Sequence, residues 1–200
     1  MIGNIIGINY LGSALDEGWG QVWKNRAINN SFEGIYVQGD NNVIAKNRVF
    51  GSEFGIFVLG DHNTITGNSA HGGIDGIELF GFHDNQVTHN YSSRNLSNGI
   101  VIVNSTGAVV ASNLVWKNGG TGLIVVDSEG TDIRANTGKQ NGVDGLAVGR
   151  TRGGPFSVLS DNEFNRNGRH GICTTPGHID GGGNTGHHNG QPPDVSFNGC

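Results

Sequence analysis

The densest group of side chains that could do chemistry lies between residues 75 and 94. Asp75 and Glu78 stand three residues apart, and His83, His89 and Arg94 follow them. A pair of carboxyl groups with a basic side chain nearby can act as general acid and general base on a bound substrate. We therefore predict these five residues as candidate catalytic residues. The alternative that the sequence leaves open is that all five are solvated side chains on an outer surface.

Metal binding is the second chemistry that these carboxylates allow. Asp75, Glu78 and Asp84 form the candidate metal site, with Ca²⁺ as the candidate ion because it prefers oxygen ligands. Ca²⁺ takes about 6–8 oxygen ligands, so two or three carboxylates are few for a tight site. Asp84 also recurs with Asp40 and Asp61 in similar turns. An aspartate at such a position often caps the turn instead.

A repeated glycine unit indicates which elements position these residues. Successive copies stand 21 to 26 residues apart, and each reads Gly, then Ile or Leu, then any residue, then an apolar residue. The copies begin at Gly34, Gly55, Gly76, Gly99, Gly122 and Gly145, with a weaker copy at Gly171. Apolar residues at every second position are typical of a strand rather than a helix. The sequence therefore predicts one such strand in every repeat.

Two columns of asparagine keep the same phase as the glycine unit. The first consists of Asn25, Asn47, Asn68, Asn90, Asn113, Asn136, Asn162 and Asn184. The second lies four residues before the glycine and consists of Asn30, Asn95, Asn118, Asn141 and Asn167, with Gly51 and Gly72 filling the two gaps. Identical amide side chains that stack in register can hydrogen-bond along the stack. We predict asparagine ladders at the corners between strands.

A repeat of this length cannot bury its own apolar face, so successive repeats must stack on one another. Stacked repeats would pair as parallel strands ~4.8 Å apart. We predict an all-β, single-domain solenoid of about eight coils over residues 1–200. Residues 25–184 would form the coils, residues 1–24 an N-terminal irregular coil or cap, and residues 185–200 a C-terminal cap. A β-sandwich, the alternative, would not keep the columns in register.

Strand alternation predicts which side chains face outward on the glycine-led strands. Tyr36, Phe57 and Phe80 belong to this outer face, which further carries Leu59, Val101, Val103, Ile124 and Val126. An apolar patch of this kind usually marks an interaction surface. The patch is predicted to be a homo-oligomer interface, a surface covered by a missing part of a longer chain, or a track on which the three aromatic rings stack against a sugar.

Composition excludes several classes of protein. Gly is 36 and Asn 25 of the 200 residues, and both are poor interior residues of helices. Only four prolines are present, which excludes collagen. The net charge of −5 gives no support to nucleic-acid binding, and no apolar run is long enough to span a membrane. Two cysteines, Cys173 and Cys200, could either pair as a disulfide or remain free thiols.

Basic residues suggest a second group of substrate contacts. Arg150 and Arg152 lie in the longest repeat, and Arg169 and His170 lie at the edge of the seventh coil. Guanidinium groups bind carboxylates well, so these residues are candidate contacts to a carboxylated sugar. Ordinary exposed loop charges are the alternative.

The glycine, aliphatic and asparagine columns over residues 25–190 resemble the right-handed parallel β-helix repeat family. Phrases of the form Asn-Gly-x-x-Gly-(Ile or Leu), as at Asn118, Asn141 and Asn167, are similar to the carbohydrate-binding and sugar-hydrolase subset and to mannuronan epimerases. The resemblance implies a single-stranded right-handed β-helix. The family also includes pectate lyases, polygalacturonases and alginate lyases.

The resemblance also implies a reaction. Polysaccharide lyases of this architecture need a group that neutralises the uronate carboxylate, often Ca²⁺ or Arg, and a base that removes the C5 proton. Asp75 and Glu78 would supply the first, and His83, His89 or Arg94 the second. The Asp-Pro-His motif of the epimerases and the Asp-Asp pair of the polygalacturonases are both absent from this sequence.

These observations lead to one functional hypothesis with two alternatives. The leading hypothesis is a secreted or cell-surface β-helix module that binds or processes an acidic or neutral polysaccharide. The first alternative is a uronate polysaccharide lyase or C5-epimerase. The second is a structural or adhesive oligomer built on the apolar outer face.

Overall fold

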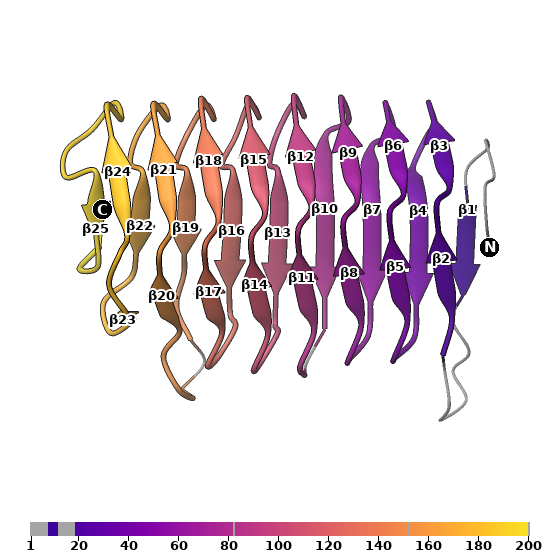
Figure 1. Ribbon diagram of the computed structural model, residues 1–200, viewed down its shortest axis with the longest axis horizontal. Coiled ribbons are helices and arrows are strands. Elements are labelled where there is room, and N and C mark those ends of the chain that lie inside the picture. Colours follow the sequence, from indigo (N-terminus) through magenta and orange to yellow (C-terminus); the bar gives the residue numbers. More distant parts are fainter. Residues whose placement is uncertain (1–7, 12–18, 82, 152, 200) are drawn as a thin grey trace.

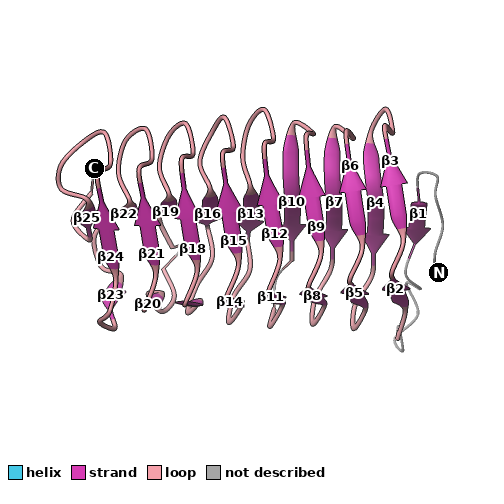
Figure 2. Cartoon of the chain, turned by 45° about the horizontal axis from the view of Figure 1, so that its top comes forward, coloured by secondary structure: helices cyan, strands magenta, loops and turns pink. Residues whose placement is uncertain are grey.

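The computed structural model describes residues 8–11, 19–81, 83–151 and 153–199, and it confirms the predicted solenoid. The chain is an all-β, right-handed parallel β-helix of about eight turns. Figure 1 shows the coils side by side along the long axis, with strands β1 and β25 at opposite ends. Figure 2 shows that the described part of the chain consists of strands and loops alone. No helix in that part has the length and hydrophobicity needed to cross a membrane.

Three parallel sheets run the length of the molecule, and we call the first of them sheet B. It contains the glycine-led strands in unbroken sequence order along the axis. Its members are β1 (Ile8–Leu11), β4 (Glu33–Gln38), β7 (Phe54–Leu59), β10 (Asp75–Phe80), β13 (Ile100–Val103), β16 (Leu123–Val126), β19 (Leu146–Val148), β22 (Ile172–Thr174) and β25 (Val195–Ser196).

Sheets A and C contain the two shorter strands of each coil. Sheet A consists of β2 (Gln21–Trp23), β5 (Val43–Ala45), β8 (Thr64–Thr66), β11 (Gln86–Thr88), β14 (Val109–Ala111), β17 (Asp132–Arg134), β20 (Val158–Ser160) and β23 (Ile179–Asp180). Sheet C consists of β3 (Arg26–Ile28), β6 (Arg48–Phe50), β9 (Ser69–His71), β12 (Tyr91–Ser93), β15 (Leu114–Trp116), β18 (Thr137–Lys139), β21 (Glu163–Asn165) and β24 (Thr185–His187).

The register between coils aligns equivalent side chains along the axis. Ile56 pairs with Ile35 and with Ile77, and the alignment continues through Ile100 to Leu123. These side chains are fully buried, as are the aliphatic centres of the sheet A strands, such as Ile65. One continuous apolar core therefore fills the cylinder.

The first asparagine column forms the predicted ladder at the corner between sheets A and C. The Oδ1 atom of Asn90 accepts hydrogen bonds from the backbone N–H and the side-chain amide of Asn68, at 2.9 and 3.0 Å. The Nδ2 atom of Asn90 donates to the Oδ1 atom of Asn113 and to the carbonyl of Ile65. The same pattern connects Asn25 to Asn184 through every intervening coil.

The second column also forms a ladder, but the two gaps are filled differently from the prediction. Ser52 accepts the hydrogen bond from the Asn30 amide, and the backbone N–H of Gly73 donates to Asn95. The prediction of Gly51 and Gly72 was wrong because two connections to sheet B are one residue shorter than the others. A fixed count of four residues back from the glycine therefore overshoots the ladder by one position.

Strands continue the sheets into both end segments. Strand β1 pairs with β4, while β24 and β25 extend sheets C and B within residues 185–200. Cys173 is disulfide-bonded, and the sequence contains one other cysteine, Cys200, which lies outside the described residues.

Candidate functional site

The outer face of sheet B carries the candidate site. Tyr36 pairs with Phe57, which pairs with Glu78, and Glu78 pairs with Val101 on the following coil. These residues lie directly above one another, as strand alternation predicts. The predicted outward positions on sheet B are therefore confirmed, and the apolar side chains there are half-buried.

Aromatic rings form a continuous group on this face. The rings of Tyr36 and Phe57 are stacked, with centroids 5.8 Å apart and planes inclined by 13°. Phe80 lies on the other side of Phe57 at 5.5 Å, and Phe54 contacts it edge-on at 5.9 Å. Partly exposed aromatic faces of this kind suit the apolar face of a sugar ring, which is an extended C–H surface.

Asp75 and Glu78 lie together beside these rings. Strict alternation would turn Asp75 inward, but the register with β7 pairs Asp75 with Phe54 and skips Gly76, and the Asp75 side chain hydrogen-bonds to that of Glu78. The Oδ1 atom of Asp75 also accepts a hydrogen bond of 2.6 Å from the backbone N–H of Asn98 on the next coil. This contact fixes the Asp75 carboxyl group next to Glu78.

The environment of Glu78 changes its acidity. Its side chain is only 9 % exposed, between Phe57 and Val101. Burial raises the pKa of Glu78 from 4.5 to about 7, and the charge of Asp75 and the hydrogen bond between the two groups add to the increase. Near neutral pH this carboxyl group can therefore both donate and accept a proton.

This raised pKa predicts a pH dependence of stability. Below pH 4.5 Glu78 is protonated in both the folded and the unfolded chain, so it has no effect. Between that pH and about 7 the unfolded chain loses its proton first, and the fold loses up to about 3 kcal/mol as pH rises. Glu78→Gln should remove this loss, so chemical denaturation should show it more stable than the parent at pH 8 but not at pH 4. Glu163→Gln, on the outer face of sheet C, is the control and should show no such difference.

The other predicted catalytic residues do not join this pair. His83 is exposed in the turn after β10, where its N–H donates to Asp61. His89 lies at the corner between β11 and β12, and Arg94 lies directly after β12 with its guanidinium 5.0 Å from the Trp116 ring. Both therefore lie on the sheet C side of the coil, whereas Asp75 and Glu78 lie on sheet B.

The candidate metal ligands are likewise divided. Asp84 is exposed in the turn beyond β10, and its carboxylate lies 3.7 Å from the Nε2 atom of His62. Among the described residues, no group of three or more His, Cys, Asp or Glu side chains is arranged to hold a metal ion. Asp75 and Glu78 are two carboxyl groups that share a hydrogen bond.

The remaining substrate-contact candidates lie toward the C-terminal end. Arg169 lies 3.9 Å from the Asp144 carboxylate, and the N–H of His170 donates to the same group. His170 is buried, with its Nδ1 atom 3.1 Å from the Pro193 carbonyl, so its visible contacts are structural. Arg150 is exposed, and Arg152 lies outside the described residues.

Comparison with known proteins identifies the family. A family model described as a right-handed beta helix region matches residues 33–185. The chain belongs to the right-handed β-helix family. A comparison with curated proteins finds no match.

Solved structures share this β-helix. The periplasmic alginate epimerase AlgG is 19 % identical, with a TM-score of 0.69, and the match covers 95 % of this chain and 50 % of that one. A single-substitution variant of AlgG is 22 % identical, with a TM-score of 0.68 and coverage of 86 % and 45 %. Identity this low shows a shared fold alone. This β-helix chain spans about half the length of those structures.

Two features of the β-helix were missed from the sequence. Phe54 joins the aromatic group because it is partly exposed beside Phe57, like Asp75, with which it pairs on the next coil. The second feature is a group of stacked basic residues. Its signal in the sequence is the repeated Lys-Asn-Arg at residues 24–26 and 46–48, because the asparagine of each copy belongs to the first ladder.

Proposed function

We propose that this β-helix binds and processes a polysaccharide on the outer face of sheet B, with Asp75 and Glu78 as its acid–base pair. The observation that carries the proposal is Glu78, whose pKa of about 7 and contact with Asp75 suit proton transfer near neutral pH. Tyr36, Phe57 and Phe80 would hold a sugar ring beside the pair.

The spacing of the carboxyl groups favours proton abstraction over hydrolysis. Retaining glycosidases keep their two carboxyl groups about 5–5.5 Å apart, and inverting ones keep them further apart. Asp75 and Glu78 are hydrogen-bonded to each other and so lie closer than either arrangement. We therefore propose a uronate lyase or C5-epimerase reaction, in which ionised Glu78 takes the C5 proton. In an epimerase, water then gives a proton to the opposite face of C5. In a lyase, the C4–O bond breaks as the C4=C5 double bond forms, and the leaving oxygen takes the proton that Glu78 holds.

We further propose that the protein works outside the cytoplasm, at a cell surface, in a periplasm or after secretion. The disulfide at Cys173 supports this, because such bonds persist in oxidising compartments. The structural likeness to AlgG, whose name describes a periplasmic alginate epimerase, is consistent with the same placement.

Incubation with alginate and with pectate, with and without Ca²⁺, tests the reaction. A lyase releases unsaturated uronates that absorb ultraviolet light, and an epimerase exchanges the C5 proton with solvent deuterium. Glu78→Gln should lower either rate by about 10²–10⁴-fold, because the glutamine cannot take a proton. Glu163→Gln, with the same change of charge, should keep the parent rate. Neither signal on either polymer, or equal rates for both variants, would contradict the proposal.

A structural or adhesive oligomer is the second candidate. The apolar column continues along sheet B beyond the aromatic group, through Val101, Val103, Ile124 and Val126, all half-buried. A surface of this kind can pack against a second copy. The molar mass from light scattering at high protein concentration tests this candidate.

A further inference from the structure

Two adjacent coils bring four cations together at the corner between sheets A and C. Lys24 and Arg26 flank the ladder residue Asn25, and Lys46 and Arg48 flank Asn47. The amide of Asn25 donates to Asn47, and Arg26 pairs in register with Arg48, so equivalent cations lie over one another. All four side chains are exposed. We call these four residues the basic corner.

In the part of the chain that the structure describes, the basic corner has no acidic partner. Within residues 19–81, 83–151 and 153–199, none of its four side chains forms an ion pair, whereas Arg134 pairs with Asp132 and Arg169 lies beside Asp144. Like charges on directly opposed strand positions destabilise a sheet. The four cations on these two coils therefore create a local positive potential on a protein whose net charge is −5.

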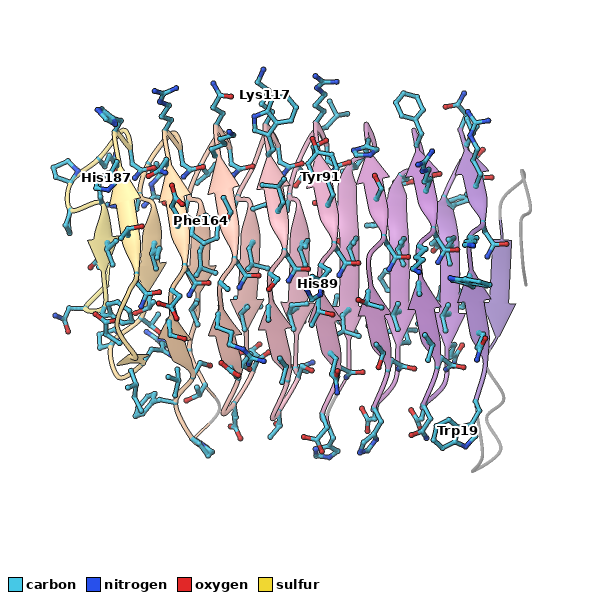
Figure 3. The ribbon with its side chains drawn as sticks, viewed as in Figure 1. Trp19, His89, Tyr91, Lys117, Phe164 and His187 are labelled. Carbon is cyan, nitrogen blue, oxygen red and sulfur yellow. The ribbon has the colours of Figure 1, made fainter. Side chains whose placement is uncertain are left out.

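A hollow lies beside the basic corner, on the outer face of sheet C. It has a volume of ≈ 400 Å³, and its lining includes Arg26, Ile28, Arg48, Phe50, Ser69, His71 and Tyr91. Phe50 is 55 % exposed, and the Tyr91 ring contacts His71 edge-on at 5.0 Å. Figure 3 labels Tyr91, on β12, and His89, at the corner just before that strand.

His71 makes the floor of the hollow polar without adding charge. It contacts Ser69, and its Nδ1 atom lies 2.8 Å from the Ser93 hydroxyl. Burial lowers the pKa of His71, and the charge of Arg94 lowers it further, so the ring is neutral at pH 7. Aromatic rings, hydroxyl groups and two guanidinium groups therefore line this one hollow.

We propose that the basic corner and this hollow bind a linear anionic polysaccharide that carries carboxylates. Arginine forms paired hydrogen bonds with a carboxylate, and the exposed ring of Phe50 offers a face for a sugar. Coils stand ~4.8 Å apart, close to the length of one sugar residue in an extended chain, so the two coils of the basic corner can meet two neighbouring carboxylates. A nucleic acid fits less well, because the cations cover only two coils and acidic turns with Asp40 and Asp61 lie at the other end of sheet A.

This surface is separate from the acid–base pair on sheet B and does not depend on it. A chain bound along sheet C would hold the polymer near the protein while another segment reaches sheet B. The two proposals therefore fail independently. Loss of binding through the basic corner leaves Glu78 intact, and loss of the Glu78 carboxylate leaves the basic corner intact.

Affinity electrophoresis in gels that contain polygalacturonate, polymannuronate or neutral dextran tests the binding. The parent should be retarded by both anionic polymers and not by dextran, and added salt should weaken the retardation. Arg26→Gln with Arg48→Gln should weaken binding by about tenfold or more, because charge-assisted hydrogen bonds are lost. Arg48→Gln alone should weaken it more than Arg134→Gln, which removes the same charge from sheet A.

Three results would overturn the proposal. The first is equal binding by Arg48→Gln and Arg134→Gln. The second is tighter binding of a single-stranded oligonucleotide than of either uronate polymer at the same salt concentration. The third is a lower melting temperature of the double variant, because removing like charges in register should leave the fold as stable or more so. If binding follows the prediction while no turnover is found, the sheet C proposal stands and the sheet B reaction does not.

Discussion

Replacing Asn113 with leucine should lower the free energy of unfolding by about 3–6 kcal/mol. The Oδ1 atom of Asn113 accepts from the backbone N–H and the amide of Asn90, at 3.0 and 3.1 Å. Its Nδ2 atom donates to the carbonyl of Val87 and to Asn136. Leucine is similar in size but offers none of these bonds. Several buried polar groups would lose partners, and each such loss costs about 1–3 kcal/mol.

Chemical denaturation followed by circular dichroism measures this loss. Asn198→Leu is the control, because Asn198 is exposed near the C-terminal end and lies outside both ladders. It should change the free energy of unfolding by less than about 0.5 kcal/mol. If Asn113→Leu were as stable as the control, the ladder would not be a source of stability, and spacing alone would explain the asparagines.

The sequence predicted the fold well because every coil of a solenoid repeats the same pattern of residues. Each coil must bury an aliphatic side chain at the same place, so Ile35, Ile56 and Ile77 recur in phase and the register follows. The error at Gly51 and Gly72 arose where a connection changes length by one residue. A fixed count of residues back from the glycine cannot detect such a change in length. The hydrogen bonds to Ser52 and Asn95 show directly which residues belong to the ladder.

The candidate site was only partly predictable. Asp75 and Glu78 were expected to be neighbours, and they are, because both lie on strand β10. His89 and Arg94 were grouped with them because they are close in sequence, yet a solenoid separates neighbours in sequence and joins residues one coil apart. The pKa of Glu78 depends on Phe57 and Val101 on adjacent coils, and the basic corner likewise requires comparison of positions 22 residues apart.

Replacing Gly122 with alanine should cost about 4–6 kcal/mol, much of the stability of an ordinary domain. A methyl group there would lie 2.6 Å from the carbonyl of Gly145, 2.6 Å from the Nδ2 atom of Asn141 and 2.7 Å from Val115. The carbonyl belongs to the next coil and the amide to the second ladder, so neither can move without breaking further hydrogen bonds. The coil would have to separate from its neighbour to admit one carbon atom.

Gly67→Ala is the matched control, because it adds the same methyl group at a corner with space. The nearest atom to that methyl would be the Cγ atom of Lys46 at 3.8 Å. Gly67 has a φ of 63°, and Ala135 holds a φ of 53° at the equivalent corner, so alanine can adopt this conformation. The control should cost about 1–2 kcal/mol at most. We expect contact between coils to have the larger effect, because the carbon added at Gly122 meets backbone whereas the carbon added at Gly67 meets a flexible side chain. Thermal unfolding that ranks the two variants in the opposite order would contradict this. It would mean that the backbone conformation at the corners limits which residues the repeat accepts.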